Sequence, residues 1–421
     1  MTTTSTAVPQ RGATYAEVFA GREVRVLLGS FLLRALSTTT EILGLSVLVL
    51  ATTGSVFWSA VAYGIGFAPQ LVGGSLFTSL ADRLPARTVI VASLLLRAVP
   101  GLLIGLVHLP VAAMLVLVAV VGAFDPVGTA ATGRLTRVLL TGDRFVVGRS
   151  VLSAVASTAQ VVGLALGGVL LLAFSAQGLL LVSGVALVVA ALVSRLGLGH
   201  HPVDEEPRHG SAVRQTLRGN RRLLADARVR GLLLAQWVPA WLVTGVEALV
   251  VGYVAHRGWA TSAASLVLAA VPVGMLVGDI AVGRGLAPRR REQVALPLAL
   301  LVGLSLVPWA LGLPYGAVVA LGVTCGIGFG YHVGLQRRFA EALPEGDQGL
   351  GFGLLSTGLM GGQGLGPVAA GALAATLGPA VAVGALGGVA VVGVLALHRT
   401  FRSGVEDEAP HGPATAGPAR S

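Results

Sequence analysis

The chain contains no lysine, and this absence excludes a class of function. The phosphate-binding loop of P-loop ATPases ends in Gly-Lys-Ser or Gly-Lys-Thr, so the sequence cannot form one. The single cysteine, Cys325, rules out an internal disulfide and a metal site built from thiolates. The Ser/His/Asp and His-Glu-x-x-His arrangements of hydrolases are also missing, and no cofactor is implied. ATP-driven work by the chain alone is therefore excluded.

Charged residues are scarce, at 11% of the 421 residues, whereas hydrophobic residues make up 54%. A soluble domain carries about 25% charged residues, so this chain cannot cover a water-facing surface. Its mean hydropathy of +0.82 agrees with that conclusion. The lipid bilayer must therefore be much of its solvent.

Long apolar runs dominate what is present. A membrane span needs roughly 20 residues at 1.5 Å per residue. Twelve stretches are long enough or nearly so: 26–50, 57–80, 88–108, 110–132, 150–174, 177–197, 231–254, 261–283, 293–312, 315–336, 349–374 and 379–399. Membrane helices tolerate the many Gly and Pro within these runs, because small residues allow close packing and Pro allows kinks. The sequence predicts an all-α membrane protein with twelve transmembrane helices.

The net charge of +10 follows membrane topology and does not indicate nucleic-acid binding. Arginine is concentrated in the termini and in the alternate loops that share the N-terminal side, for example at 134–149, 208–230 and 289–291. In the opposite loops the only arginine is Arg257. By the positive-inside rule, we expect both termini to be cytoplasmic and the protein to lie in the inner membrane. Residues 1–24 are polar and mixed in charge, so no cleavable signal peptide is expected.

Landmarks of the first half recur 203–205 residues later in the same order. Arg25 returns as Arg230, Leu71-Val72-Gly73-Gly74 as Leu276-Val277-Gly278-Asp279, Arg134 as Arg338, and Gln160-x-x-Gly163 as Gln363-x-x-Gly366. Several matches in one order indicate a duplicated unit. The fold class is therefore predicted as two six-helix pseudo-repeats, an arrangement in which many secondary transporters bind substrate where the halves meet.

The duplication and the loop lengths divide the chain into five parts. Residues 1–24 are a cytoplasmic lead, 25–197 the first six-helix bundle, 198–228 a central loop, 229–399 the second bundle, and 400–421 a disordered tail.

Two short amphipathic helices are expected on the cytoplasmic side, at 14–24 and at Val213–Ala227, the second with its arginines toward anionic lipid. His200-His201 followed by Asp204-Glu205-Glu206 is better explained as a solvated linker than as a metal site.

The loop after the second span carries a family signature. Ser79 to Arg87 reads SLADRLPAR, with Asp82, Arg83 and Arg87 at the acidic and basic positions. With twelve spans in two halves, it resembles the loop between helices 2 and 3 of the major facilitator superfamily. The resemblance implies that these three residues form a cytoplasmic gate, and that the protein is a monomeric transporter. A solvated turn that obeys the positive-inside rule is the alternative for the three residues. Thr78 replaces the usual Gly and Ala86 a common basic residue.

Two glycine runs extend the resemblance. The fifth span contains Gly163, Gly167 and Gly168, and its repeat partner in the eleventh contains Gly366, Pro367 and Gly371. They are similar to the Gly-Pro-x-x-Gly-Gly run of antiporter-type members, and such residues permit close helix packing. With Tyr15 to Arg25 and Thr53-Gly54-Ser55, they resemble bacterial exporters of drugs, macrolides or siderophores.

Ionisable residues within the spans are few, and each costs roughly 2.5–3.5 kcal/mol at mid-bilayer on insertion scales. The candidates for proton coupling or substrate binding are Arg34, Glu41, Arg97, Asp125 and Glu247. Glu41 and Glu247 occupy similar depths in repeat partners, and a partly desolvated carboxylate there binds a proton more readily. Structural ion pairing remains the alternative for each.

Arg34, Arg97 and Asp125 each lie roughly 12–14 Å from the cytoplasmic end of their span, at 1.5 Å per residue. This matching depth predicts an Arg34–Asp125 pair, with Arg97 as a competitor for Asp125. Arg34 and Glu41 are seven residues apart, which places them on one helix face. The resemblance places the third span at the periphery, so Arg97 is expected to be structural or snorkelling. Pro126 is expected to bend the fourth span into a hinge.

Polar and aromatic residues among aliphatic walls suit an amphipathic or cationic organic ligand, although each alone is more often packing. The candidates for lining a cavity are Gln70, Gln160, Trp237, Trp241, Tyr331, His332 and Gln363.

The main hypothesis is a proton-driven exporter of a small amphipathic compound, working by alternating access in the lipid bilayer. An uptake permease for a metabolite is the alternative, although few Asn, Gln and aromatic residues lie in the spans. A non-transporting receptor or scaffold is disfavoured, since no sizeable soluble domain is present, and an intramembrane enzyme is more remote.

Overall fold

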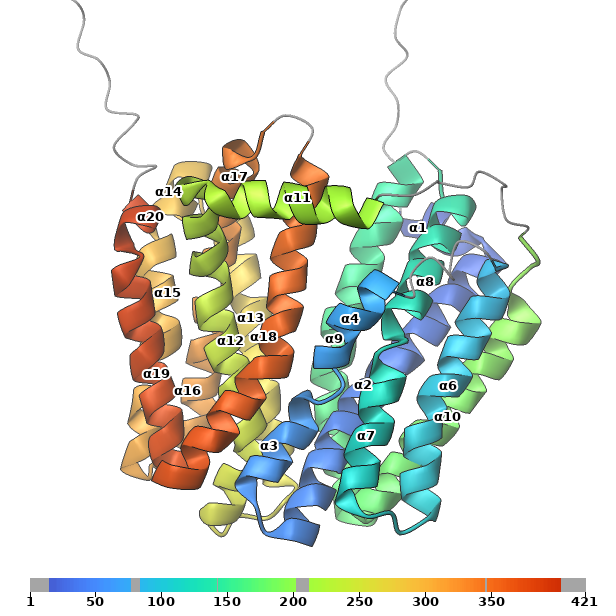
Figure 1. Ribbon diagram of the computed structural model, residues 1–421, viewed down its shortest axis with the longest axis horizontal. Helices are drawn as coiled ribbons and strands as arrows, with labels where there is room; N and C mark the ends of the chain where they lie inside the picture. Colours follow the sequence, from blue (N-terminus) through green and yellow to red (C-terminus); the bar gives the residue numbers. More distant parts are fainter. Residues whose placement is uncertain (1–14, 77–83, 142, 202–211, 345–346, 403–421) are drawn as a thin grey trace, which may run out of the picture. The chain divides into compact units, whose positions relative to one another are not determined.

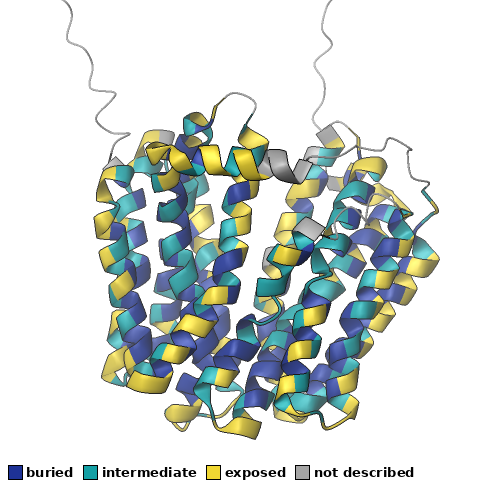
Figure 2. Ribbon diagram, in the orientation of Figure 1, coloured by how far each residue is buried: buried dark blue, intermediate teal, exposed yellow. Residues whose placement is uncertain are grey.

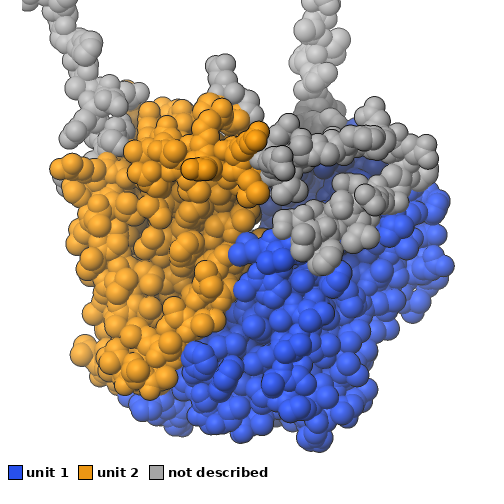
Figure 3. All heavy atoms as spheres, in the orientation of Figure 1, with its two compact units in different colours: residues 1–210, 250–269 blue, residues 211–249, 270–421 orange. Residues whose placement is uncertain are grey.

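The computed structural model describes residues 15–76, 84–141, 143–201, 212–344 and 347–402 (Figure 1). Within these ranges every regular element is a helix, as the sequence predicts. The contacts divide the chain into two units: residues 1–210 with 250–269, and residues 211–249 with 270–421 (Figure 3). The gate residues Asp82 and Arg83 and most of the tail lie outside the described residues.

The first unit is organised around α2 (Arg22–Thr53), which carries Arg34 and Glu41. Helix α10 (Ala176–Gly197) packs along both α2 and α6 (Ala86–Leu106), and α9 (Asp143–Ala173) packs on α2. A fully buried cluster that includes Leu94, Leu135 and Leu187 fills the space between these helices. The packing brings α2 and α6 together at the depth of their charged residues.

Two spans of the first unit are interrupted. The second span consists of α3 (Val56–Gly64) and α4 (Ala68–Leu76), and the fourth of α7 (Val111–Gly122) and α8 (Asp125–Leu139). Pro126 lies in the first turn of α8, where a missing N–H costs least. The bend expected at Pro126 is present as an interruption of the span just before it, which places Asp125 at the start of a helix.

The second half of the chain contains α12 (Ala227–His256) and α13 (Ala263–Gly285), of which residues 250–269 belong to the first unit. It continues through α14 (Pro288–Gln293), α15 (Ala295–Leu304), a 3₁₀ turn (Val307–Leu311), α16 (Tyr315–Gly328), α17 (Tyr331–Ala342), α18 (Gln348–Leu377), α19 (Pro379–Ala396) and α20 (His398–Arg402). The tenth span breaks between α16 and α17, at the position where the fourth span breaks between α7 and α8.

Eleven segments of the described chain are long and apolar enough to cross a membrane. The remaining predicted span, the eleventh in chain order, is α18, which has 30 residues and no charge, and whose many glycines lower its hydropathy. Exposed residues occur along the helices of each unit (Figure 2). They include large apolar side chains such as Leu172, Leu196 and Val392, which are 66–74% exposed. Lipid would cover these side chains, as expected for a multi-pass membrane protein.

Each unit starts with a short leading helix, α1 (Tyr15–Ala20) in the first and α11 (Ala212–Ala225) in the second. Arg25 donates to the carbonyls of Phe19 and Ala20, at the end of α1. Arg230 donates to the carbonyls of Leu224 and Ala225, at the end of α11. The arginine pair that marks the duplication therefore makes the same contact twice.

Close backbone approaches repeat as well. Gly73 lies against the backbone of Ala123 in the first unit. At the positions about 205 residues later, a Cβ added to Gly278 would lie 2.5 Å from the carbonyl oxygen of Ile327. Both glycines are needed because a side chain at either position would overlap the neighbouring helix.

An ion pair ties each leading helix to the fifth span of its own unit, with reversed polarity. Glu17 of α1 lies 3.5 Å from Arg144 of α9. In the second unit the basic residue is on the leading helix, and Arg222 of α11 pairs with Asp347 at the start of α18. Glu17 and Arg222 are 205 residues apart, so the duplicated contact has kept its place and exchanged its charges.

Candidate functional site

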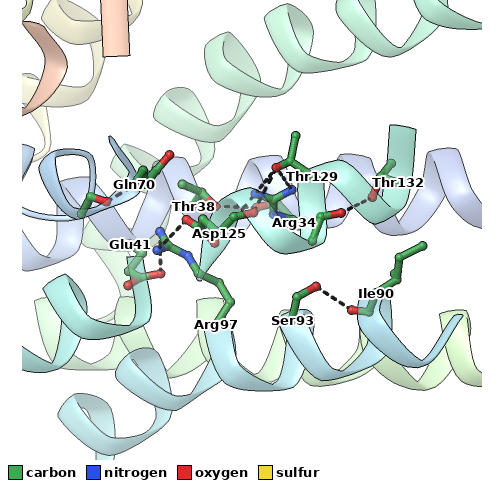
Figure 4. Close-up of polar contacts among 12 residues, drawn as sticks. Arg34, Thr38, Glu41, Gln70, Ile90, Ser93, Arg97, Asp125, Thr129 and Thr132 are labelled. Atoms are coloured by element: carbon green, nitrogen blue, oxygen red, sulfur yellow. Dashed lines mark hydrogen bonds and ion pairs between the residues drawn. The ribbon is translucent and has the colours of Figure 1, made fainter. Parts of the chain in front are cut away.

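Four charged side chains meet inside the first unit (Figure 4). Arg34 and Glu41 come from one face of α2, as their spacing predicts. Arg97 comes from the middle of α6, and Asp125 is the first residue of α8. Three helices therefore bring two acids and two bases together; these four residues are called the charge network below.

Arg97 is the centre of the charge network. Its Nη1 lies 3.2 Å from Asp125 Oδ2, and its Nη2 lies 3.5 Å from Glu41 Oε2. The predicted Arg34–Asp125 pair is also present, with Nη2 to Oδ1 at 3.8 Å. Arg34 donates in addition to the Thr129 hydroxyl at 3.3 Å. Asp125 thus faces two guanidinium groups, whereas Glu41 faces one.

Burial separates the inner part of the charge network from its outer part. Glu41 is 2% exposed and Arg97 4% exposed, whereas the Arg34 side chain is 21% exposed. Arg97 therefore does not snorkel toward the membrane surface, and of the two expected roles, structural or snorkelling, the burial favours the structural one. Packing of α6 against both α10 and α8 turns this side of the helix inward. An arginine buried so deeply requires acidic partners, and the two carboxylates supply them.

The network leaves hydrogen-bonding capacity unused. Neither carboxylate oxygen of Glu41 receives a hydrogen bond from the described chain, and Nε and Nη1 of Arg97 donate none. The separations are those of ion pairs in contact, longer than the 2.7–2.9 Å of charge-assisted hydrogen bonds. Buried groups in this condition are costly, so they are candidates for binding a proton, water or ligand.

A small pocket with a volume of about 20 Å³ lies beside Glu41 and Arg97. Its polar lining includes Thr38 and Gln70, and its aromatic lining Tyr63 and Phe67. Gln70, predicted to line a cavity, lies here and donates to the Gly66 carbonyl at 3.0 Å. Thr38 lies between Arg34 and Glu41 on the same face of α2, a spacing from which the sequence could have placed it here.

The charge network is not duplicated. The positions 205 residues after Arg34 and Arg97 are Pro239 and Val302. Glu247 keeps the carboxylate of Glu41 but lies half-buried in α12 of the second unit. The two carboxylates predicted as equivalents therefore have different surroundings.

Trp237 and Trp241 bind a neighbouring helix. The two rings stack at 5.9 Å, with 8° between their planes. Trp237 Nε1 donates to the Leu355 carbonyl at 2.9 Å, and Trp241 Nε1 to the Gly358 carbonyl at 2.8 Å. The indole N–H groups, which a ligand would use, are occupied by these bonds between α12 and α18. This favours a packing role for both tryptophans over lining a cavity.

The other predicted lining residues are scattered. Tyr331 is fully buried and donates to the Gln236 carbonyl at 3.2 Å, while His332 stacks on Phe329 at 5.7 Å. Gln160 is exposed on α9, and Gln363 is half-buried on α18. None of these four lines the pocket beside Glu41.

The glycine runs lie at helix contacts, as packing motifs require. Gly163 and Gly167 face α2, where added Cβ atoms would lie 3.0 Å from Thr39 and 2.9 Å from Leu43. Gly168 faces Ser265. In α18, a Cβ on Gly366 would lie 2.6 Å from the Trp241 carbonyl oxygen, and Pro367 and Gly371 are buried.

Arg87 is the only predicted gate residue within the described chain. Its Nη1 donates to the Leu198 carbonyl, just after α10, at 3.3 Å. A related contact has no signature in the sequence beyond the repeat of Arg134 as Arg338. Buried Arg338 donates to the carbonyls of Thr400 and Phe401 in α20, at 2.7 and 2.9 Å. Arg87 binds the carbonyl that follows the last span of the first unit, and Arg338 binds carbonyls of the short helix that follows the last span of the second. Each positive charge complements the negative end of a helix dipole.

Two duplicated helical units with a buried charge network define a class of protein: a multi-pass membrane transporter. Residues 24–339 match the Major Facilitator Superfamily, and the chain belongs to this family. The family and the fold make the protein a transporter of small molecules in the lipid bilayer and not an enzyme. No curated protein matches the chain significantly.

Solved structures agree in fold. The nucleoside transporter NupG is similar with a TM-score of 0.72 and 14% identity, over 91% of this chain and 99% of that one. A bacterial homolog of the human lysosomal transporter Spinster, inward-facing and unoccupied, gives a TM-score of 0.68 and 16% identity, over 91% of this chain and 94% of the other. At these identities the likeness supports the twelve-helix fold alone.

Proposed function

We propose that the protein is a proton-coupled exporter of small amphipathic organic compounds, working by alternating access as a monomer. In this proposal it lies in the cytoplasmic membrane with both termini in the cytoplasm. The observation that carries the proposal is the charge network in the first unit, where Arg97 holds Glu41 and Asp125 within 3.5 Å. Glu41 is the proposed proton carrier, because it has a single cationic partner and unused hydrogen-bonding capacity.

The charge network can respond to a proton in a simple way. With all four groups ionised the net charge is zero, and a proton on Glu41 leaves one positive charge in a buried site. Arg97 then interacts mainly with Asp125, and the contact between α2 and α6 weakens. Such a change is local and electrostatic, and it can bias a two-state packing of helices.

The available energy is sufficient for export. One proton entering down a potential of about 150 mV releases roughly 3.5 kcal/mol, at about 2.3 kcal/mol per 100 mV. At about 1.4 kcal/mol per decade, that free energy supports a substrate gradient of a few hundred-fold.

The test uses everted membrane vesicles with an acid interior, monitored by a fluorescent ΔpH probe. A panel of amphipathic drugs, macrolides and siderophores is added in turn to vesicles with the wild-type chain, Glu41→Gln, or no transporter. An exported compound should dissipate the pH gradient only with the wild type. Glu23→Gln, the same substitution near the start of α2, is the matched control and should behave like the wild type.

Accumulation in intact cells decides the direction of transport. Export predicts lower compound levels in cells with the wild-type chain, and a protonophore should abolish the difference. Higher accumulation would instead identify the uptake permease. If Glu41→Gln exchanges protons normally, the coupling role passes to Asp125 or Glu247.

A further inference from the structure

Helix α11 contacts the second unit with one of its faces. A Cβ added to Gly219 would overlap the side chain of Leu350 in α18, and Leu223 on the same side of α11 is 2% exposed. Arg222, at the edge of this side, pairs with Asp347 at the start of α18. One face of α11 is therefore docked on α18, and the face opposite to it is left for another partner.

The opposite face of α11 carries Leu217, Arg218 and Arg221, which are all exposed. Spacings of three and four residues make Arg218 and Leu217 neighbours of Arg221 on a helix. Leu217 is 63% exposed, and no hydrogen bond or ion pair joins either arginine to another described residue. The sequence from Leu217 to Ala225 contains no acidic residue. This face therefore offers two guanidinium groups beside an apolar side chain.

The connection to α12 sets the level of α11 relative to the membrane. Asp226 alone separates Ala225, the end of α11, from Ala227, the start of α12. Asp226 Oδ1 accepts hydrogen bonds from the backbone N–H groups of Arg228 and Val229 at 2.8 and 3.0 Å, and so caps α12. Figure 1 shows α11 running across the N-terminal ends of α12 and α18. Both of these helices are spans, so α11 lies along the surface that they cross, at the level of the lipid head groups.

The chemistry of the exposed face selects one kind of partner. A guanidinium group binds phosphate through two parallel N–H donors. The exposed leucine beside the arginines gains from an apolar neighbour, which the boundary between head groups and acyl chains supplies. An anionic phospholipid carries both the phosphate and the apolar chain, and it is present at the level where α11 lies.

We propose that α11 binds anionic phospholipid of the cytoplasmic leaflet, with Arg218 and Arg221 on head-group phosphate and Leu217 at the boundary with the acyl chains. Arg222, which was also expected to face lipid, remains paired with Asp347. The lipid and α18 then hold opposite faces of one helix, which fixes the start of the second unit to the membrane. The proposal uses the proposed cytoplasmic orientation, and it is independent of proton coupling and of the transported compound.

Hydrogen exchange of the α11 amides in the full-length protein measures this binding. The protein is placed in nanodiscs of phosphatidylcholine alone or of phosphatidylcholine with added phosphatidylglycerol. At low ionic strength, phosphatidylglycerol should slow exchange by about fivefold for each of the two arginines, or about 25-fold in all. High salt should reduce the effect, because it screens exposed charges.

The double variant Arg218→Gln/Arg221→Gln should lose the slowing by phosphatidylglycerol, and Leu217→Gln should show less of it. Glutamine has nearly the helix propensity of arginine and leucine, so these substitutions leave α11 helical. Arg284→Gln/Arg290→Gln is the matched control, because it removes two exposed arginines from α13 and α14 in the same unit. Exchange of α11 in this control should respond to phosphatidylglycerol as in the wild type.

The proposal is overturned if phosphatidylglycerol leaves exchange of wild-type α11 unchanged, a comparison that needs no variant and that misfolding cannot hide. It is also overturned if the control pair loses the effect as fully as the α11 pair. Equal slowing by inorganic phosphate in phosphatidylcholine nanodiscs would identify a site for a free anion instead. Slowing by soluble polyglutamate and not by phosphatidylglycerol would identify an acidic protein partner instead.

The lipid result and the transport result are separate. Proton-coupled export in everted vesicles, without an effect of phosphatidylglycerol on α11, would overturn the lipid site and leave the proposed function standing. Lipid-dependent exchange of α11 in a protein that exports nothing would do the reverse.

Discussion

Arg97 lies 3.2 Å from Asp125 across the contact between α6 and α8, and the other end of its guanidinium faces Glu41. One side chain therefore joins α2, α6 and α8 in the interior of the first unit. Removing one partner of a buried ion pair leaves an uncompensated charge, whereas removing both partners can be nearly neutral.

Arg97→Leu should destabilise the protein by about 3–5 kcal/mol, because the buried carboxylate of Glu41 loses its only cationic partner and Asp125 loses one of two. The double variant Arg97→Leu/Glu41→Leu should recover much of this loss, since Asp125 keeps Arg34 and no unpaired charge remains. The measurement is the thermal midpoint of purified protein in detergent. If the double variant were no more stable than Arg97→Leu, the unpaired charge of Glu41 would not be the cause of the lost stability.

Gly362→Ala should disturb the contact between α12 and α18, because its Cβ would overlap the Trp241 ring. Overpacking of this kind typically costs about 1–3 kcal/mol. Gly353→Ala on the same helix is the matched control, since nothing lies within 4 Å of its Cβ, and it should be neutral or slightly stabilising. The environment of the tryptophans can be followed by fluorescence. If the two substitutions had equal effects, the close contact between Gly362 and the Trp241 ring would not be important for stability.

Arg222→Glu should release α11 from α18 by placing two acids together at the ion pair. The double variant Arg222→Glu/Asp347→Arg gives the second unit the polarity of Glu17 and Arg144, and it should restore docking. Because Arg222 is 65% exposed, the pair contributes about 0–1 kcal/mol at most. Hydrogen exchange of the α11 amides is therefore the appropriate readout, since it responds to small local changes. Rapid exchange in the double variant would show that the charges do not hold the helix.

Periodicity and residue spacing were enough to predict the duplication, the common face of Arg34 and Glu41, and the interruption of the fourth span. Matched landmarks such as Arg25 and Arg230 indicated the duplication, and the spacing of Arg34 and Glu41 indicated their common face. Asp125-Pro126 indicated the break in the fourth span, because proline lacks the donor that continues a helix.

The orientation of Arg97 could not be predicted in this way. A span that is apolar on every side has no hydrophobic face to show which direction is inward, so the rotation of α6 depends on its neighbours. The tryptophans present a similar difficulty. Their partners are backbone carbonyls, which every helix carries, so only the glycines four residues apart at Gly358, Gly362 and Gly366 hint at the helix that receives them.

The reversed polarity of the two leading-helix ion pairs has a consequence for synthesis of the chain. Helix α1 leaves the ribosome first, and α11 follows after the first six spans. If α11 approached Arg144, Arg222 would meet a like charge, and Glu17 would likewise meet Asp347. The two duplicated halves therefore carry opposite charges at equivalent positions. Docking of a leading helix on the wrong bundle would bring like charges together, which favours docking on its own bundle.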